Sequence, residues 1–316
     1  MSCSRSMLAS VMTLGLGAGV LTVSASQEAA SPALAGTRHI YISAVDKRGV
    51  PVPDLTAGDV AIREDGTARE IVGVQPAAAP LHIALLVDDT GPGLRFIREG
   101  AGVFIQRLAG RAEIALVSTG GRNSTLVDFT ARVDSLYRGV LQLVTRTTNG
   151  AYLLDGVRDA IRALNEREAE RPVIVVLTLE GPEFSSMRAD RLLDDLQRSR
   201  AVLHVISLGK PTLKTMTGWN EMPSQSLKEN LDENINRKKF LEDGTRLSGG
   251  SFQQVLVDSG IPPALKSLAD ELASQYVVVY LRPEGLAAPK KINVSASRRG
   301  VKVRARTEAP RVAGSK

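Results

Sequence analysis

Two carboxylates and a hydroxyl follow an apolar run in the stretch LLVDDTGPG, residues 85–93. Asp88, Asp89 and Thr90 therefore place hard oxygen donors directly after residues with the pattern of a buried strand. Such donors suit a hard cation such as Mg²⁺, which takes about six oxygen ligands at roughly 2.1 Å. Pro92, two residues after Thr90, has no side-chain oxygen. The stretch contains only part of a metal site.

Two further polar stretches are expected to meet the first. They are TRTTNGAYLLDGV at 145–157, which precedes a helical pattern, and VVLTLEGPE at 175–183, which ends another apolar run. In open α/β sheets, ligands bind beyond the carboxyl ends of the strands. The candidate binding residues are Asp88, Asp89, Thr90, Thr148 and Glu180.

Strands and helices alternate over the middle of the chain. Continuous apolar runs of strand length stand at 81–89, 112–120, 171–181 and 201–209. Between them, apolar residues recur at helical spacing, as in Ile97, Ala101, Phe104 and Leu108. Strands that are apolar on both faces need helices on both faces. The predicted fold class is α/β, with a doubly wound, mostly parallel, Rossmann-like sheet and a small additional β module.

The chain divides into six segments by composition. Residues 1–25 read as a secretory signal peptide and 26–37 as a small-residue linker. We expect an N-terminal β module of about four short strands at 38–79 and the α/β domain at 80–284, with SQYVVVYLRP (274–283) as its last strand and an irregular excursion at 210–240. A C-terminal β-hairpin at 285–307 is predicted to pack with the N-terminal module, and 308–316 to be a disordered tail.

Export follows from the signal peptide, and we expect a secreted or periplasmic protein. The only cysteine, Cys3, would be removed with the signal, which excludes disulfides and cysteine-ligated metals. Removal of Arg5 leaves 39 basic against 34 acidic residues, a net charge of +5. That excess favours contact with an anionic envelope surface over nucleic acid. No later segment reaches the roughly 20 apolar residues of a membrane span.

The stretches VDDTGPG, TNGAYLLDGV and VVLTLEGPE together resemble a von Willebrand factor A-type (VWA) domain. The chain from about 38 to 306 is similar to a secreted bacterial VWA-related family of the acidobacterial type. DLTAGDVAIREDG, LSGGSF and KINVSASRRGVKVRAR resemble recurring elements of that family.

The resemblance implies a metal-ion-dependent adhesion site, in which a D-x-S-x-S turn, a threonine and an aspartate bind a cation. Asp88 and Thr90 match the first two ligands, whereas Pro92, Ala151 and Leu179 stand where the other three belong. We therefore expect a degenerate site, no metal and no other cofactor. Mg²⁺ held by substitute residues such as Asp89 stays an alternative, as does a structural role in which Asp88 and Thr90 cap the following helix.

No catalytic motif is present. The chain lacks G-x-S-x-G, H-E-x-x-H and phosphate-loop patterns, and its three histidines are scattered, so we expect no enzyme. The predicted function is a metal-independent protein-interaction module with an unidentified protein partner. Two alternatives are a cation-dependent adhesion-type domain with a rearranged site, and an envelope-associated structural protein. The latter would bind an anionic surface through the exposed strand face of Lys302, Arg304 and Arg306.

Overall fold

The protein is represented by a computed structural model that describes residues 36–91, 93–145, 150–179, 181–209 and 225–307. The predicted signal peptide, most of the linker and the predicted tail lie outside the described residues. Pro92, Thr148 and Glu180 lie outside them too, as does the first part of the excursion. No helix of the described ranges is long and apolar enough to cross a membrane.

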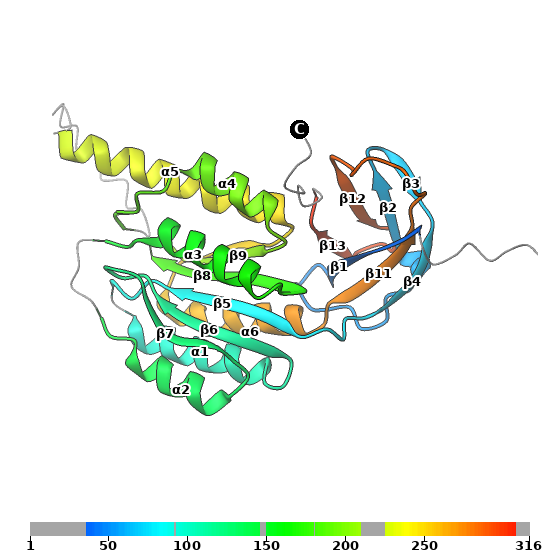
Figure 1. The fold of residues 1–316 in the computed structure, drawn as a ribbon. Coiled ribbons are helices and arrows are strands. Elements are labelled where there is room, and N and C mark those ends of the chain that lie inside the picture. The colour runs from blue at the N-terminus through cyan, green and yellow to red at the C-terminus, as the bar shows by residue number, and fades with distance from the viewer. Residues whose placement is uncertain (1–35, 92, 146–149, 180, 210–224, 308–316) are drawn as a thin grey trace, which may run out of the picture. The chain divides into compact units, whose positions relative to one another are not determined.

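A six-stranded sheet with the order β10–β9–β8–β5–β6–β7 forms the centre of the α/β domain (Figure 1). All neighbours pair in parallel except β7, which runs antiparallel to β6 at one edge. The strands are β5 (Leu81–Val87), β6 (Ala112–Ser118), β7 (Ser124–Thr130), β8 (Arg171–Leu179), β9 (Val202–Leu208) and β10 (Phe252–Val255).

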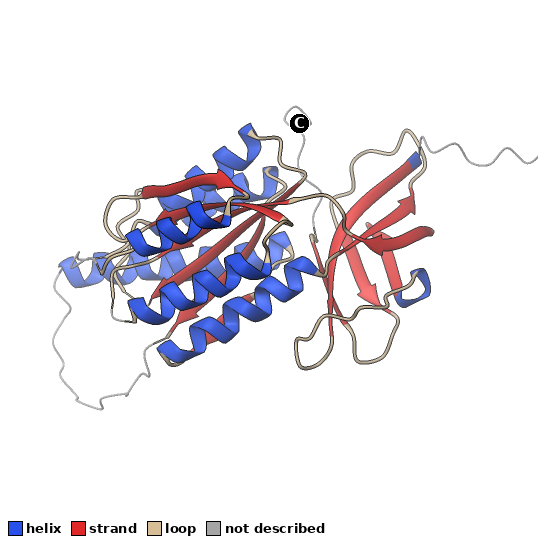
Figure 2. Ribbon diagram, turned by 90° about the horizontal axis from the view of Figure 1, so that it is seen from below, coloured by secondary structure: helices blue, strands red, loops and turns tan. Residues whose placement is uncertain are grey.

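Helices cover both faces of this sheet (Figure 2). One face packs against α1 (Leu94–Arg107), α2 (Val133–Gln142) and α6 (Ile261–Ala273), which follows the 3₁₀ turn η3 (Asp258–Gly260). The other face packs against α3 (Leu153–Glu166), α4 (Ala189–Arg198) and α5 (Gln225–Ser248).

Burial on both faces explains why the strands read as unbroken apolar runs. In β5, Ile83 and Leu85 belong to the core on the α1 side, whereas Ala84 and Leu86 belong to the core on the α3 side. Side chains of a strand alternate between faces, so each residue needs an apolar partner layer. The predicted doubly wound α/β class is confirmed.

Two smaller sheets enclose a third core. A four-stranded sheet has the order β13–β1–β11–β4, and a three-stranded sheet has the order β12–β2–β3. Their elements are β1 (Thr37–Val45), η2 (Ala57–Asp59), β2 (Val60–Glu64), β3 (Thr67–Arg69), β4 (Ile71–Pro76), β11 (Tyr276–Leu281), β12 (Ile292–Ala296) and β13 (Lys302–Ala305). We call these two sheets the β module.

The prediction that β11 ends the α/β sheet is wrong, and so is the predicted boundary at residue 284. β11 pairs antiparallel with β1 and β4 of the β module. Its burial alternates, with Tyr276, Val278 and Tyr280 buried in the module's core and the residues between them partly exposed. Because valines occupy intervening positions too, the sequence of this half-buried strand has the continuous apolar pattern of a fully buried one.

The predicted C-terminal hairpin is also wrong in its pairing. β12 pairs with β2, and β13 pairs with β1, in two different sheets. Each C-terminal strand therefore adds to an N-terminal strand. The chain between them contains the whole six-stranded sheet.

The sequence predicts that Lys302, Arg304 and Arg306 share an exposed basic strand face. The prediction is wrong for the two arginines. Arg304 forms an ion pair with Glu271 of α6. Arg306 donates to the carbonyl oxygens of Leu196 and Gln197, at 3.1 and 2.7 Å, where α4 ends. Orphan carbonyls at a helix end accept such donors readily, so this arginine stabilises α4.

Candidate functional site

The three polar stretches do meet at the carboxyl edge of the six-stranded sheet. Asp88 follows β5, and its carboxylate accepts a hydrogen bond from the Leu179 backbone at the end of β8. Ala151 forms isolated bridges with Gly120 after β6 and with Glu183 after β8. Loops far apart in sequence therefore converge where α/β sheets place ligands.

Asp88 is almost completely buried, and both its carboxylate oxygens are used. Oδ1 accepts from the backbone N–H of Thr90 at 3.1 Å and from its hydroxyl at 2.6 Å. Oδ2 accepts from the Leu179 N–H at 3.2 Å and the Thr178 hydroxyl at 3.5 Å. These bonds fix the turn after β5 to the end of β8.

Asp89 connects the same turn to β6. Its Oδ1 accepts from the Ser118 hydroxyl at 2.8 Å and from the Gly120 N–H at 3.1 Å. A Cβ at Gly120 would lie 2.2 Å from this oxygen, so only glycine allows the approach. Both adjacent carboxylates thus act as structural acceptors between strands.

The described residues at this edge do not supply the oxygen ligands of an octahedral Mg²⁺ site. The Leu179 side chain lies over Gly91, with its Cδ1 2.6 Å from the place a Cβ on that glycine would take. Ala151 is buried and offers only a methyl group. A hard cation needs several oxygen ligands, and here a leucine fills the space beside Asp88. No cluster of three or more His, Cys, Asp or Glu suited to a metal occurs among the described residues.

The alternative in which Asp88 and Thr90 cap the following helix is wrong. The N-cap of α1 is Gly93, in the left-handed region at φ 91°, and no side chain caps it. Thr90 instead donates its hydroxyl back to Asp88. The two residues close their own turn and do not reach the helix.

A guanidinium supplies positive charge at this edge of the sheet. Arg237 of α5 is buried, and its Nη1 donates to the carbonyl oxygen of Leu179 at 3.3 Å. Burial raises the pKa of the nearby Glu183 carboxyl, and the charge of Arg237 opposes that rise. Sequence reasoning missed Arg237, although its spacing to Phe240, Leu241 and Ser248 places it on the buried face of a helix.

Glu183 caps the start of α3 from the loop after β8. Its Oε1 accepts from the backbone N–H of Leu154 at 3.4 Å and of Ser185 at 3.2 Å, while Oε2 is buried and has no partner among the described residues. Burial raises the pKa of this carboxyl, and its hydrogen bonds and the charge of Arg237 reduce that rise. A carboxylate at a helix N-terminus satisfies orphan donors and interacts favourably with the helix dipole.

Two aromatic side chains lie partly exposed next to this cap. Tyr152, just before α3, and Phe184, just after Glu183, have ring centroids 6.2 Å apart, and each is 37% exposed. The backbone fixes them, since Phe184 N donates to the Ala151 oxygen at 2.8 Å and Tyr152 N to the Thr119 oxygen at 3.0 Å. Nothing in the sequence pattern connected these two rings.

Comparisons with known proteins returned matches among solved structures alone. The chain matches no protein-family model and no curated protein. Among solved structures it is similar to a von Willebrand factor type A protein from Catenulispora acidiphila, at 10% identity and TM-score 0.45 over 87% of this chain and 73% of that one. It is also similar to the vWF domain of the type V pili tip protein Mfa5 from Porphyromonas gingivalis, at 11% identity and TM-score 0.43 over 62% and 96%.

A third similar structure is the conserved hypothetical protein BatB from Bacteroides thetaiotaomicron, at 15% identity and TM-score 0.42 over 62% of this chain and 100% of that one. The six-stranded sheet with helices on both faces is the α/β arrangement that the sequence resemblance predicts.

Proposed function

We propose that this chain is an exported, non-enzymatic protein-interaction module of VWA type that binds its partner without a metal ion. The observation that carries the proposal is the Tyr152–Phe184 pair, partly exposed at the carboxyl edge of the sheet. Aromatic residues are enriched at the centres of protein interfaces, because they bury a large area at low entropic cost. The hydrogen-bonded loops around the pair hold it in place.

Metal independence is supported by the chemistry at Asp88. Its oxygens already accept four hydrogen bonds, and Leu179 supplies hydrocarbon where an oxygen ligand would be needed. Arg237 adds a fixed positive charge near the same strand end, which disfavours a second cation. The partner would therefore contact side chains directly.

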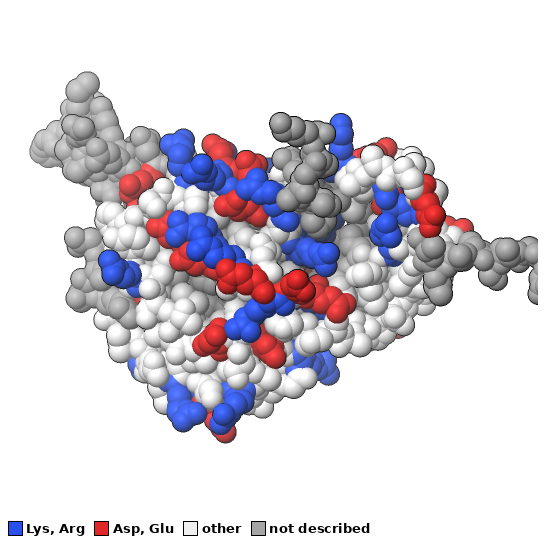
Figure 3. Space-filling model, viewed as in Figure 1, with Lys and Arg blue, Asp and Glu red and all other residues white. Residues whose placement is uncertain are grey.

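The anionic-surface alternative loses its main support. Arg304 and Arg306 are engaged with α6 and α4, so they do not form an open basic face. On the side of the molecule in Figure 3, positive and negative side chains alternate without a large patch of one sign. We do not favour electrostatic binding to an envelope surface.

Metal independence is tested by thermal unfolding in Mg²⁺ and in EDTA. A ligand at about 100 times its Kd stabilises the folded state by roughly 2.7 kcal/mol. We expect the same melting temperature in both conditions for the natural chain. Leu179→Asp should melt lower in EDTA and recover with Mg²⁺, because it adds a second carboxylate at the strand end whose backbone N–H already contacts Asp88. A Mg²⁺-dependent rise in the natural chain that Asp88→Ala abolishes would support the cation-dependent alternative instead.

The contact surface is tested by crosslinking the full chain to envelope extract of its source cells in EDTA. The double variant Tyr152→Ser with Phe184→Ser should lose its crosslinked partner. Tyr137→Ser is the matched control, since Tyr137 of α2 is also 37% exposed but lies away from this edge. Equal crosslinking by all three chains would contradict the proposed surface.

A further inference from the structure

A cavity of about 570 Å³ lies at the opposite end of the six-stranded sheet from the loops described above. Its walls include the first residues of β8, Arg171 to Val173, and Val202 at the start of β9. β1 and β11 of the β module supply much of the remainder. Small-molecule sites in proteins typically have about 300–1,000 Å³, so the volume suits a metabolite-sized ligand.

The walls carry an excess of positive charge. Only two glutamates, Glu64 and Glu170, line the cavity. Glu64 is buried and already binds Arg69 at 2.9 Å and Arg282 at 3.0 Å, so it does not offset the other cations. The lining arginines are Arg38, Arg171, Arg200, Arg282, Arg304 and Arg306.

Arg171 is the most buried of these cations, with 7% of its surface exposed. Its guanidinium donates to neutral acceptors, the Ala79 oxygen at 2.5 Å and the Gln275 amide oxygen at 2.7 Å. Its Nε has no hydrogen-bond partner among the described residues, and no carboxylate of these residues forms an ion pair with it. Burial lowers the pKa of Arg171, and the negative charge of Glu170 opposes only part of that effect. A buried charge without a direct ion pair is costly, so an anion nearby would stabilise it.

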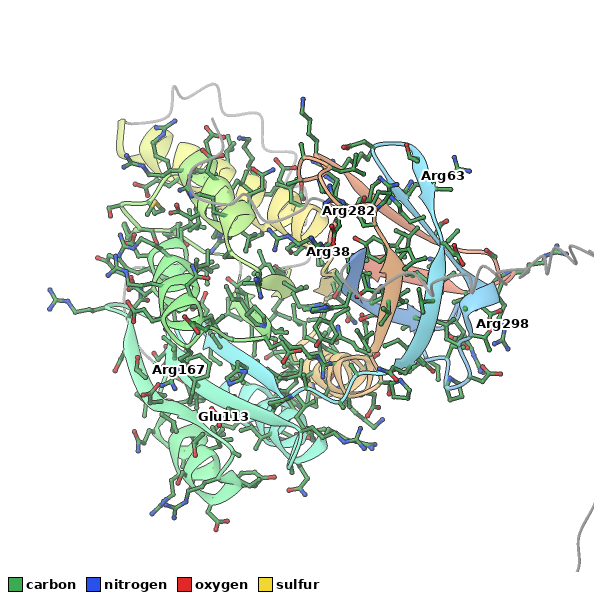
Figure 4. The ribbon with its side chains drawn as sticks, turned by 45° about the vertical axis from the view of Figure 1, so that its right-hand side comes forward. Arg38, Arg63, Glu113, Arg167, Arg282 and Arg298 are labelled. Carbon is green, nitrogen blue, oxygen red and sulfur yellow. The ribbon has the colours of Figure 1, made fainter. Side chains whose placement is uncertain are left out.

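Arg38 and Arg200 have guanidinium groups available at the cavity. Both side chains are exposed. Arg38 donates only to the carbonyl oxygen of its neighbour Thr37, and Arg200 has no hydrogen bond or ion pair within the described part of the chain. Figure 4 shows Arg38 close to Arg282, as expected from the pairing of β1 with β11, whereas Arg63 lies apart on β2.

Part of the wall is apolar. Ile40, Val202, Pro289 and Ile292 line the cavity beside the charged groups. The Tyr41 ring also lies there and stacks under the Arg171 guanidinium at 5.2 Å, while its hydroxyl donates to Glu170 at 2.5 Å. This hydrocarbon surface would accommodate the less polar body of a ligand.

We propose that this cavity binds a small organic anion, whose phosphate or carboxylate group contacts the guanidinium groups of Arg38 and Arg200 near Arg171. The planar guanidinium fork matches both oxyanions in bidentate geometry and is weakly hydrated. The apolar body lies against Ile40 and Val202. This site is separate from the protein-contact surface and does not depend on it.

Calorimetric titration of the full chain with 1-naphthyl phosphate, 1-naphthoate and uncharged 1-naphthol tests the proposal. We expect saturable binding of at least one anion and none of the alcohol. The anion that binds more tightly identifies the ligand group as phosphate or carboxylate. Arg38→Met and Arg200→Met should each weaken binding about tenfold or more, the usual loss for a charge-assisted hydrogen bond.

Arg63→Met is the matched control, because Arg63 is also an exposed arginine of the β module and does not line the cavity. It should bind like the natural chain. Exposed arginines contribute little to stability, and melting curves verify that all three variants fold. The proposal is overturned if neither anion binds, if 1-naphthol binds as tightly, or if Arg63→Met weakens binding as much as the cavity variants.

Discussion

Replacement of His204 by asparagine should remove a pH-dependent part of the protein's stability. His204 of β9 is 1% exposed, and its Nδ1 lies 2.9 Å from the Ser251 hydroxyl. Its Nε2 is buried and has no hydrogen-bond partner in the part of the chain that the structure describes. Burial lowers the pKa of this histidine to about 4 from 6.5, an effect that Glu271 opposes and Arg304 reinforces. The folded state therefore holds the imidazole neutral.

The direction in which stability changes with pH follows from proton uptake by His204 in the unfolded chain. Below pH 6.5 the imidazole binds a proton in the unfolded state but stays neutral in the folded state. The free energy of unfolding therefore falls as the pH falls. With pKa values of 6.5 and about 4, this linkage is negligible at pH 7.5 and reaches about 2 kcal/mol at pH 5. The loss occurs between pH 6.5 and 4 and levels off below.

Urea unfolding of both chains at pH 7.5 and pH 5 measures this effect. His204→Asn keeps an amide near the Ser251 hydroxyl but cannot titrate. Its stability deficit relative to the natural chain should shrink by about 2 kcal/mol on going to pH 5. All other titrating groups cancel in the difference. His39→Asn, an exposed histidine, should show no such convergence. If the free energies of unfolding of His204→Asn and the natural chain differ by the same amount at both pH values, the imidazole is not held neutral by burial.

Two further substitutions test the carboxyl edge of the sheet. Gly120→Ala should destabilise by about 1–3 kcal/mol in urea, because its Cβ would meet Asp89 at 2.2 Å, whereas Gly181→Ala has open space and should cost far less. Glu183→Gln should gain stability relative to the natural chain as the pH rises above 4.5, because the raised pKa of this carboxyl makes its ionisation unfavourable when folded. The exposed Glu242→Gln is the control, and a constant difference across pH would contradict this account of Glu183.

The sequence was sufficient for the α/β fold because β5 and β8 are buried on both faces and flanked by helices of clear period. It was insufficient for β11, whose alternating burial is hidden by valines on both sides. Strand pairing of β12 and β13 could not be read locally, since their partners β2 and β1 lie over 200 residues away in the chain.

At the candidate site, the positions of Asp88 and Leu179 followed from their places at strand ends. What these residues contact did not follow. The placement of Leu179 over Gly91 and of Arg237 against the Leu179 carbonyl depends on the docking of a turn and of α5, which no sequence period encodes. The Tyr152–Phe184 contact likewise joins two loops through tertiary packing.

The pairing of β13 with β1 has a mechanical consequence. The two strands run antiparallel, with Ile42 opposite Ala305 and Val45 opposite Lys302, so residues 36 and 307 leave the sheet at the same end. Tension applied between these two points would break the hydrogen bonds between β1 and β13 one pair at a time, starting from that end. The six-stranded sheet is formed by the part of the chain between β1 and β13, whose two ends this strand pairing holds together.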